Sequence, residues 1–170
     1  MDKYSTIVWL LPIVFMIHDF EEIIFFKSWL NKNKGYLTEK FPKIMKQLPF
    51  FDNFSTSAFA LAVAVLFMLL SLITLCSVIF DNYLLWLAAF MIFFVHLFMH
   101  LAQWIVMRRY IPAIYTTFFA LIYCIYTFYE IITKNIFHVS EIVLWTIIGF
   151  AMLVPFFILA LKLAEMFNKK

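Results

Sequence analysis

Five long apolar runs dominate this chain of 170 residues. A helix that crosses the hydrocarbon core of a bilayer needs about 20 mainly apolar residues. Hydrophobic residues make up 66% of the sequence and charged residues only 14%, which is more apolar surface than a soluble domain of this size can bury. We therefore predict an all-α, polytopic transmembrane helix bundle that forms a single domain over residues 1–170. Its five spans are expected at residues 6–28, 55–80, 83–107, 112–133 and 140–162.

The positive charges predict the orientation of this bundle. Of the 13 lysines and arginines, 11 fall in the first loop, the third loop and the tail, whereas only Lys3 and Lys134 fall on the opposite side. Because cytoplasmic loops carry the excess of lysine and arginine, the N-terminus is expected outside and the C-terminus in the cytoplasm. We expect a multi-pass protein of the cell membrane.

Local signals predict the boundaries of the spans. Asp81 and Asn82 predict a tight turn between the second and third spans. Pro112 fits the first turn of the fourth span, and Pro12 and Pro155 are candidate kinks. Residues 27–54 mix lysines with aromatic residues, which is typical of a segment on an anionic leaflet, although a plain basic loop explains them equally well.

Ionisable residues interrupt the first span at His18, Asp19, Glu21 and Glu22. A charged side chain at the centre of a membrane helix costs on the order of 2.5–3.5 kcal/mol on insertion scales, so such a cluster needs partners. At about 100° per residue, Glu21 and Glu22 lie on either side of His18 on one helix face, and Asp19 lies beside that face. We expect this polar face to meet another helix.

The third span offers that partner in His96 and His100, which lie one helical turn apart on one stripe. In the expected topology both helices run from outside to inside. His18 follows the start of its span by 12 residues and His96 by 13. At ~1.5 Å per residue, both lie roughly 18–20 Å deep. We therefore predict that the two polar patches meet.

Imidazole and carboxylate groups are ligands that zinc, iron and manganese accept, and helix bundles build metal sites from such pairs. The expected metal ligands are His18, Glu21, Glu22, His96 and His100. The spare carboxylate among Asp19, Glu21 and Glu22 is the expected general base, and these three are the candidate catalytic residues. The leading hypothesis is a membrane-embedded, metal-dependent hydrolase or isomerase that acts on a lipid or other apolar small molecule.

Three other interpretations remain open. A transporter or channel for metal ions or protons would use the same groups as a transit site, and a metal-free acid/base isomerase would use them without an ion. A purely structural role would have them form hydrogen bonds between helices. No glycine-rich phosphate loop or nucleic-acid-binding module is recognisable, so no nucleic-acid partner is expected.

Two short motifs carry a resemblance to a known family. The run His18-Asp19-Phe20-Glu21-Glu22 matches an HxxEE pattern, a histidine follows in a later span, and Tyr110-Ile111-Pro112-Ala113 resembles the accompanying YxPG pattern. Together they resemble the HXXEE family of small bacterial and archaeal membrane proteins, whose function is not established.

The resemblance implies a membrane protein with a polar site. It carries over His18, Glu21, Glu22 and one of His96 and His100 as site positions. It also implies that Tyr110 and Pro112 form a structural element at the cytoplasmic end. One departure is visible, because Ala113 stands where the pattern has glycine, a residue that permits close backbone approach.

Overall fold

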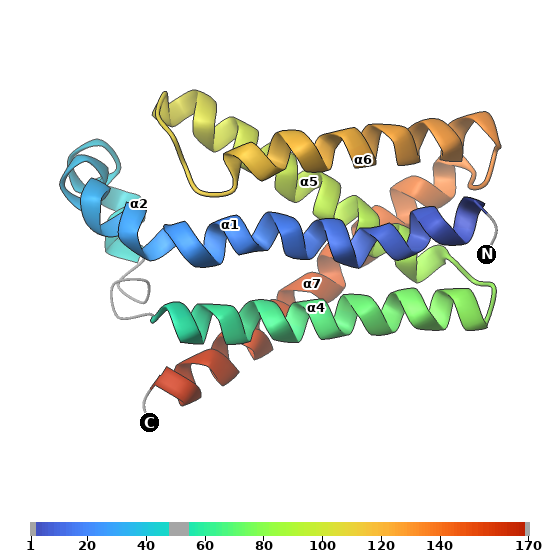
Figure 1. Cartoon of the computed structure of the whole chain (residues 1–170), viewed down its shortest axis with the longest axis horizontal. Coiled ribbons are helices and arrows are strands. Elements are labelled where there is room, and N and C mark those ends of the chain that lie inside the picture. The colour runs from blue at the N-terminus through green and yellow to red at the C-terminus, as the bar shows by residue number, and fades with distance from the viewer. Residues whose placement is uncertain (1–2, 48–54, 169–170) are drawn as a thin grey trace.

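The computed structural model describes residues 3–47 and 55–168, and all regular secondary structure in these ranges is helical. The helices are α1 (Lys3–Lys40), α2 (Pro42–Gln47), α4 (Thr56–Ile79), α5 (Leu84–Met107), α6 (Ile114–Thr133) and α7 (Val139–Asn168). Helix α1 lies between α4 and α6, and these three run nearly parallel, whereas α5 and α7 cross them obliquely (Figure 1). The predicted all-α fold class is confirmed.

Four helical segments are long and apolar enough to cross a membrane: Thr56–Ile79, Leu84–Met107, Ile114–Thr133 and Val139–Ala160. They match the second to fifth predicted spans, so the chain is a polytopic membrane protein. The first predicted span also forms a helix, but its polar cluster makes it less apolar than these four, and its crossing of the membrane stays a prediction. The start of α1 and the end of α7 lie at opposite ends of the bundle, as an odd number of crossings requires (Figure 1). Which end faces the cytoplasm also stays a prediction.

Helix α1 is longer than the predicted first span. It continues past residue 28 to Lys40, so the first part of the expected surface segment is helical, and residues 48–54 of that segment lie outside the described residues. The extension has an apolar face, on which Leu30 and Leu37 pack against Met107, Ile111 and Ile114. The helix ends where Pro42 disfavours helical geometry at the residue before it.

The loops confirm one predicted boundary and correct another. Asp81 has φ of 48° in the tight turn between α4 and α5, as the sequence predicts. Pro112, in contrast, lies in a turn before α6 rather than in the first turn of that helix. Ala113 follows it with φ of 71° and is the N-cap of α6. The turn therefore ends at Ala113, and the helix begins at Ile114.

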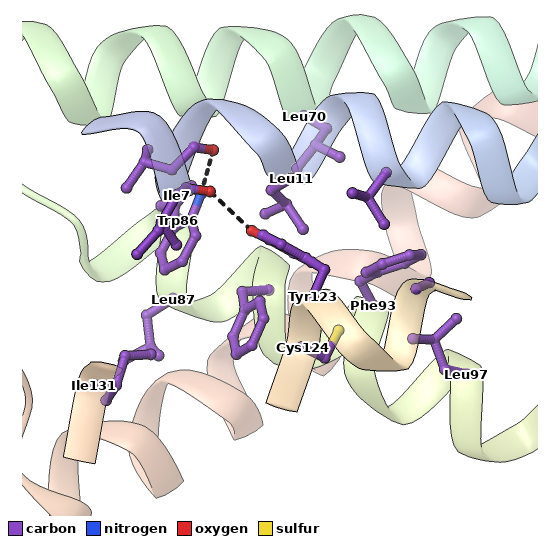
Figure 2. Packing of buried hydrophobic residues seen from close by; sticks show 14 residues of the cluster. Ile7, Leu11, Leu70, Trp86, Leu87, Phe93, Leu97, Tyr123, Cys124 and Ile131 are labelled. Atoms are coloured by element: carbon purple, nitrogen blue, oxygen red, sulfur yellow. Dashed lines mark hydrogen bonds between the residues drawn. The ribbon is translucent and has the colours of Figure 1, made fainter. Parts of the chain in front are cut away.

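Pro12 lies inside α1, and its effect on the backbone is compensated by another helix. Proline has no N–H, so the carbonyl of Val8, four residues earlier, loses its partner within the helix. The Trp86 indole of α5 donates a hydrogen bond of 3.1 Å to that carbonyl. Tyr123 of α6 donates one of 3.0 Å to the carbonyl of Ile7 (Figure 2). These bonds attach the first part of α1 to α5 and α6 within the main apolar core.

Candidate metal centre

Three imidazole rings meet where α1 faces α5. The ring centroid of His18 lies 5.3 Å from that of His96 and 5.0 Å from that of His100, and the last two are 4.4 Å apart. His18 is completely buried and packs edge-on against the Phe93 ring. The predicted meeting of the polar patches of α1 and α5 is thus observed.

The ligand atoms of this cluster have the spacing of a metal site. Nε2 of His100 lies 2.9 Å from Nε2 of His96 and 3.4 Å from Oε1 of Glu22. Zinc binds imidazole nitrogen at about 2.0–2.1 Å, so neighbouring ligand atoms in a tetrahedral site are about 3.3 Å apart. His18, His96 and His100 each offer a ligand atom within 4.8 Å of the other two. This spacing allows the three imidazoles to share one ion.

Two carboxylates complete the cluster. Asp19, Glu22 and His96 form a second group whose ligand atoms all lie within 4.8 Å of one another. Asp19 is buried, whereas Glu22 keeps 19% of its side chain exposed. Because both groups contain His96, the five residues form one continuous site of three imidazoles and two carboxylates.

Glu21 does not lie in this cluster, although it was one of the expected ligands. Its Oε1 accepts a hydrogen bond of 2.9 Å from the Tyr110 hydroxyl. Its Oε2 accepts bonds of 2.9 Å from the Thr116 backbone N–H and 2.7 Å from the Thr116 hydroxyl. The free N–H groups and the dipole at the start of α6 favour an anion at this position. The structure therefore separates the two glutamates of the motif, with Glu22 at the imidazoles and Glu21 at the end of α6.

The turn between α5 and α6 explains how Glu21 reaches its partners. The left-handed geometry of Ala113 turns the chain so that Tyr110 and Thr116 both approach the same carboxylate. The Trp29 indole supports the turn through a bond of 2.7 Å to the Tyr110 carbonyl. Burial, together with the hydrogen bond to Glu21, raises the pKa of the Tyr110 phenol. This phenol therefore remains a hydrogen-bond donor at neutral pH.

Sequence reasoning did not identify Thr116, which lies between the two parts of the site. Its hydroxyl is 3.3 Å from Nδ1 of His18 while it also bonds to Glu21. The only available signal was its position shortly after the Tyr110–Ala113 motif, which places it in the first turn of α6. Threonine is common in membrane helices as a packing residue, so the residue type alone did not single it out.

An open depression adjoins this part of the site. It has a volume of about 580 Å³ and is lined by Glu21, Phe25, Tyr110, Tyr115 and Thr116. Phe25 and Tyr115 are exposed to the surroundings of the bundle, and the Tyr115 ring stacks on that of Tyr110. The lining is mainly aromatic, and Glu21 and Thr116 supply its polar groups.

Comparison with curated proteins and with solved structures finds no match. One family model matches residues 9–127, from the first turns of α1 to the second half of α6, and is described as a protein of unknown function with an HXXEE motif. The matched region contains all three imidazoles, Asp19, both glutamates, and the turn with Tyr110 and Thr116. It covers well over half of the chain, and the chain therefore belongs to the HXXEE family.

Proposed function

We propose that this protein is a metal-dependent enzyme of the cell membrane that acts on a lipid or other apolar substrate. The observation that carries the proposal is the buried arrangement of His18, His96 and His100. Nε2 of His18 is buried without a hydrogen-bond partner in the described part of the chain. A buried polar atom without a partner costs about 1–3 kcal/mol. A metal ion bound between the three rings would remove that cost.

The carboxylates support the same proposal. Two ionised carboxylates 4.8 Å apart repel each other by roughly 3 kcal/mol at an effective dielectric constant of about 20. Asp19 and Glu22 offer oxygen atoms within this distance, in a buried site. Such a pair requires either a proton or a cation nearby. With three imidazoles beside them, a divalent transition metal such as zinc, iron or manganese fits this donor set.

The residues divide into ligands and a base. His18, His96, His100 and Glu22 would hold the ion, which when bound would act as a Lewis acid on a carbonyl or phosphoryl oxygen. Asp19 lies within reach of the same site and would accept a proton during hydrolysis or isomerisation. Glu21, with its oxygens bonded to Tyr110 and Thr116, would serve a supporting role.

The surroundings support an apolar substrate. The depression beside Thr116 has mainly aromatic walls and opens at the side of the bundle between α1 and the start of α6. Phe25 and Tyr115 are exposed there, so an acyl chain or a similar group would contact aromatic rings rather than charges. A polar group of the same molecule would lie near Thr116 and Glu21, which supply the polar groups of the lining.

A transit site for ions receives less support. The first half of α1 and the corresponding part of α5 form the main apolar core, with Leu11, Trp86, Phe90 and Phe93 buried. An ion that moved from the imidazoles toward the start of α1 would have to pass these side chains. The core therefore favours a reaction centre over a path that connects both ends of the bundle.

The test is the metal content of the full-length protein, purified in mild detergent after growth with zinc, iron and manganese. The double variant His18→Ala, His96→Ala lacks two of the proposed ligands and is compared with the wild type. Thr117→Val is the folding control, because Thr117 is buried on α6 and its hydroxyl has no hydrogen-bond partner among the described residues. We expect close to one bound ion in the wild type and the control and none in the double variant. Equal, negligible metal in all three would refute the proposal.

Two further assays separate the rival functions. Turnover that survives complete chelation, once a substrate is found, would favour a metal-free acid/base isomerase. Site-dependent metal or proton flux into liposomes would favour a transporter. Both assays use the same double variant as the site-deficient control.

A further inference from the structure

The hydroxyl group of Thr116 connects Glu21 to His18. Oγ1 lies 2.7 Å from Oε2 of Glu21 and 3.3 Å from Nδ1 of His18. Its other acceptors are the carbonyl oxygens of Ala113 at 3.1 Å and His18 at 3.4 Å, and both are more distant than the carboxylate. The shortest contact joins the hydroxyl to the charged group, which is the strongest acceptor of the set.

Counting protons gives the direction of these bonds. A threonine hydroxyl has one proton to donate and two lone pairs that accept. Its proton goes to Glu21, so toward His18 the oxygen atom is an acceptor. Nδ1 of His18 must then carry a hydrogen. In a neutral imidazole only one ring nitrogen is protonated, so Nε2 has a free lone pair.

The burial of Nε2 agrees with this assignment. Nε2 lies in a fully buried side chain and has no hydrogen-bond partner among the residues that the structure describes. A hydrogen on Nε2 would be a donor without an acceptor. A lone pair on Nε2, in a ring whose centroid lies 5.3 Å from that of His96 and 5.0 Å from that of His100, is what a metal ligand requires.

We infer that Glu21 and Thr116 are positioning residues that hold His18 in the Nδ1–H tautomer and thereby prepare Nε2 to bind a metal. Histidine ligands are commonly oriented in this way by a carboxylate or another acceptor on the second nitrogen. Here the carboxylate acts through a hydroxyl group. The two glutamates of the HxxEE motif therefore have different tasks, since Glu22 faces the imidazoles and Glu21 orients one of them. The consequence for metal binding rests on the proposed function, whereas the tautomer itself does not.

Glu21 is well held for this task. Its two carboxylate oxygens accept three hydrogen bonds from Tyr110 and Thr116, and Glu21 is only 7% exposed. The carboxylate consequently has little freedom to rotate toward the imidazoles. The Tyr110–Ala113 turn contributes by placing the start of α6 against α1.

The tautomer of His18 is the direct test. The full-length protein is labelled with ¹⁵N-histidine, stripped of metal and measured by NMR in detergent micelles, where the ring ¹⁵N shifts distinguish the two tautomers. The chain has four histidines, and His18→Ala assigns the signal. We expect Nδ1–H in the wild type and in Thr116→Ser, which keeps the hydroxyl. We expect loss of this tautomer in Thr116→Val, with Thr116→Ala as the replacement if the valine variant does not fold.

Thr117→Val is the matched control, because it removes the neighbouring buried hydroxyl, which forms no hydrogen bond in the described part of the chain. It should leave the tautomer unchanged. A wild-type Nε2–H tautomer, or an Nδ1–H tautomer that persists in Thr116→Val, would overturn the inference. A change in Thr117→Val equal to that in Thr116→Val would overturn it as well, because the effect would then be one of packing.

Metal affinity provides the second measurement, with zinc as the probe. Loss of such a supporting hydrogen bond typically weakens metal binding 10–100-fold. We expect this weakening in Thr116→Val, with recovery in Thr116→Ser and no change in Thr117→Val. Equal zinc affinity in all variants would overturn the role in metal binding. If even the wild type binds no metal, the proposed function fails, and the NMR result alone decides whether Glu21 and Thr116 set the tautomer.

Discussion

Gly149 lies where α7 crosses α5, and adding one methyl group there tests how closely these helices must pack. A Cβ atom at this position would lie 3.1 Å from the backbone oxygen of Ala88 and 3.0 Å from Cδ1 of Ile92. The Ile92 side chain has rotamers available to it, but the Ala88 carbonyl belongs to the α5 backbone and cannot rotate away. Ordinary contacts begin near 3.4 Å, so α5 and α7 would have to separate by a few tenths of an ångström.

The expected magnitude follows from two opposing contributions. Overpacking a tight contact typically costs about 1–3 kcal/mol. Replacing glycine with alanine inside a helix raises the free energy of unfolding by about 0.5–1 kcal/mol, because the unfolded chain has less backbone entropy. Gly149→Ala should therefore lower the free energy of unfolding by ~1 kcal/mol, the middle of a net range of roughly 0–2.5 kcal/mol. Gly35→Ala is the matched control, because Gly35 is exposed in α1 and a Cβ atom there meets nothing within 4 Å. It should raise the free energy of unfolding by ~0.5–1 kcal/mol.

The assay is reversible unfolding in mixed micelles with increasing SDS, followed by circular dichroism. Zinc affinity is measured on the same samples, because Ile92 precedes His96 by one turn and movement of α5 displaces that ligand. We expect weaker zinc binding in Gly149→Ala and unchanged binding in Gly35→Ala. If both variants were stabilised equally, the close approach of α5 and α7 would be wrong.

Three further predictions concern the backbone and the turn. Ala113→Gly relieves the left-handed strain of the alanine, which costs ~1–2 kcal/mol. It also removes a buried methyl group worth ~0.8 kcal/mol and adds backbone entropy to the unfolded chain, so the free energy of unfolding should change by less than ~1 kcal/mol. A loss of more than ~2 kcal/mol would contradict the positive φ at this residue. Trp86→Phe leaves the Val8 carbonyl without its partner, so it should cost ~1–3 kcal/mol in SDS unfolding, and a neutral result would show that Pro12 needs no compensation from α5. Tyr110→Phe should destabilise the protein at pH 7. Because the pKa of Tyr110 is raised in the folded state, its contribution to stability is complete below the ordinary pKa near ~10 and is lost as the pH rises through the raised pKa. In melting curves recorded at a series of pH values, the difference in Tm between wild type and Tyr110→Phe should therefore narrow only above pH ~10.

Several features of the fold were predictable because they depend on local chemistry. The apolar runs predicted α4 to α7 within a few residues, except where α7 continues beyond its predicted end, since length and hydropathy are properties of each segment alone. Ser55 caps α4 by accepting a bond of 3.1 Å from the N–H of Ala58, and Asp81 allows the turn after it. The extension of α1 was not predictable in this way, because its helical state depends on apolar contacts of Leu30 and Leu37 with the distant turn before α6.

The candidate site shows the same division. Helical periodicity predicted that His18, Glu21 and Glu22 share one face of the first span. The distance from the start of each span predicted that His96 lies at the same depth in the membrane as His18. Periodicity, however, could not say which neighbouring helix each side chain would meet. The two glutamates lie on opposite sides of His18, and α1 packs against both α5 and α6, which offer different groups. Glu22 meets the imidazoles of α5, and Glu21 meets the start of α6.

The sequence by itself therefore determined that this is a helical membrane protein with imidazoles and carboxylates at a common depth, because spacing and hydropathy act within single segments. Only the tertiary structure decided that Glu21 binds the Tyr110–Thr116 region while Asp19 and Glu22 join the histidines. That choice depends on how helices distant in the sequence pack, and a hydrogen bond of Glu21 to Thr116 across 95 positions is invisible to any local pattern.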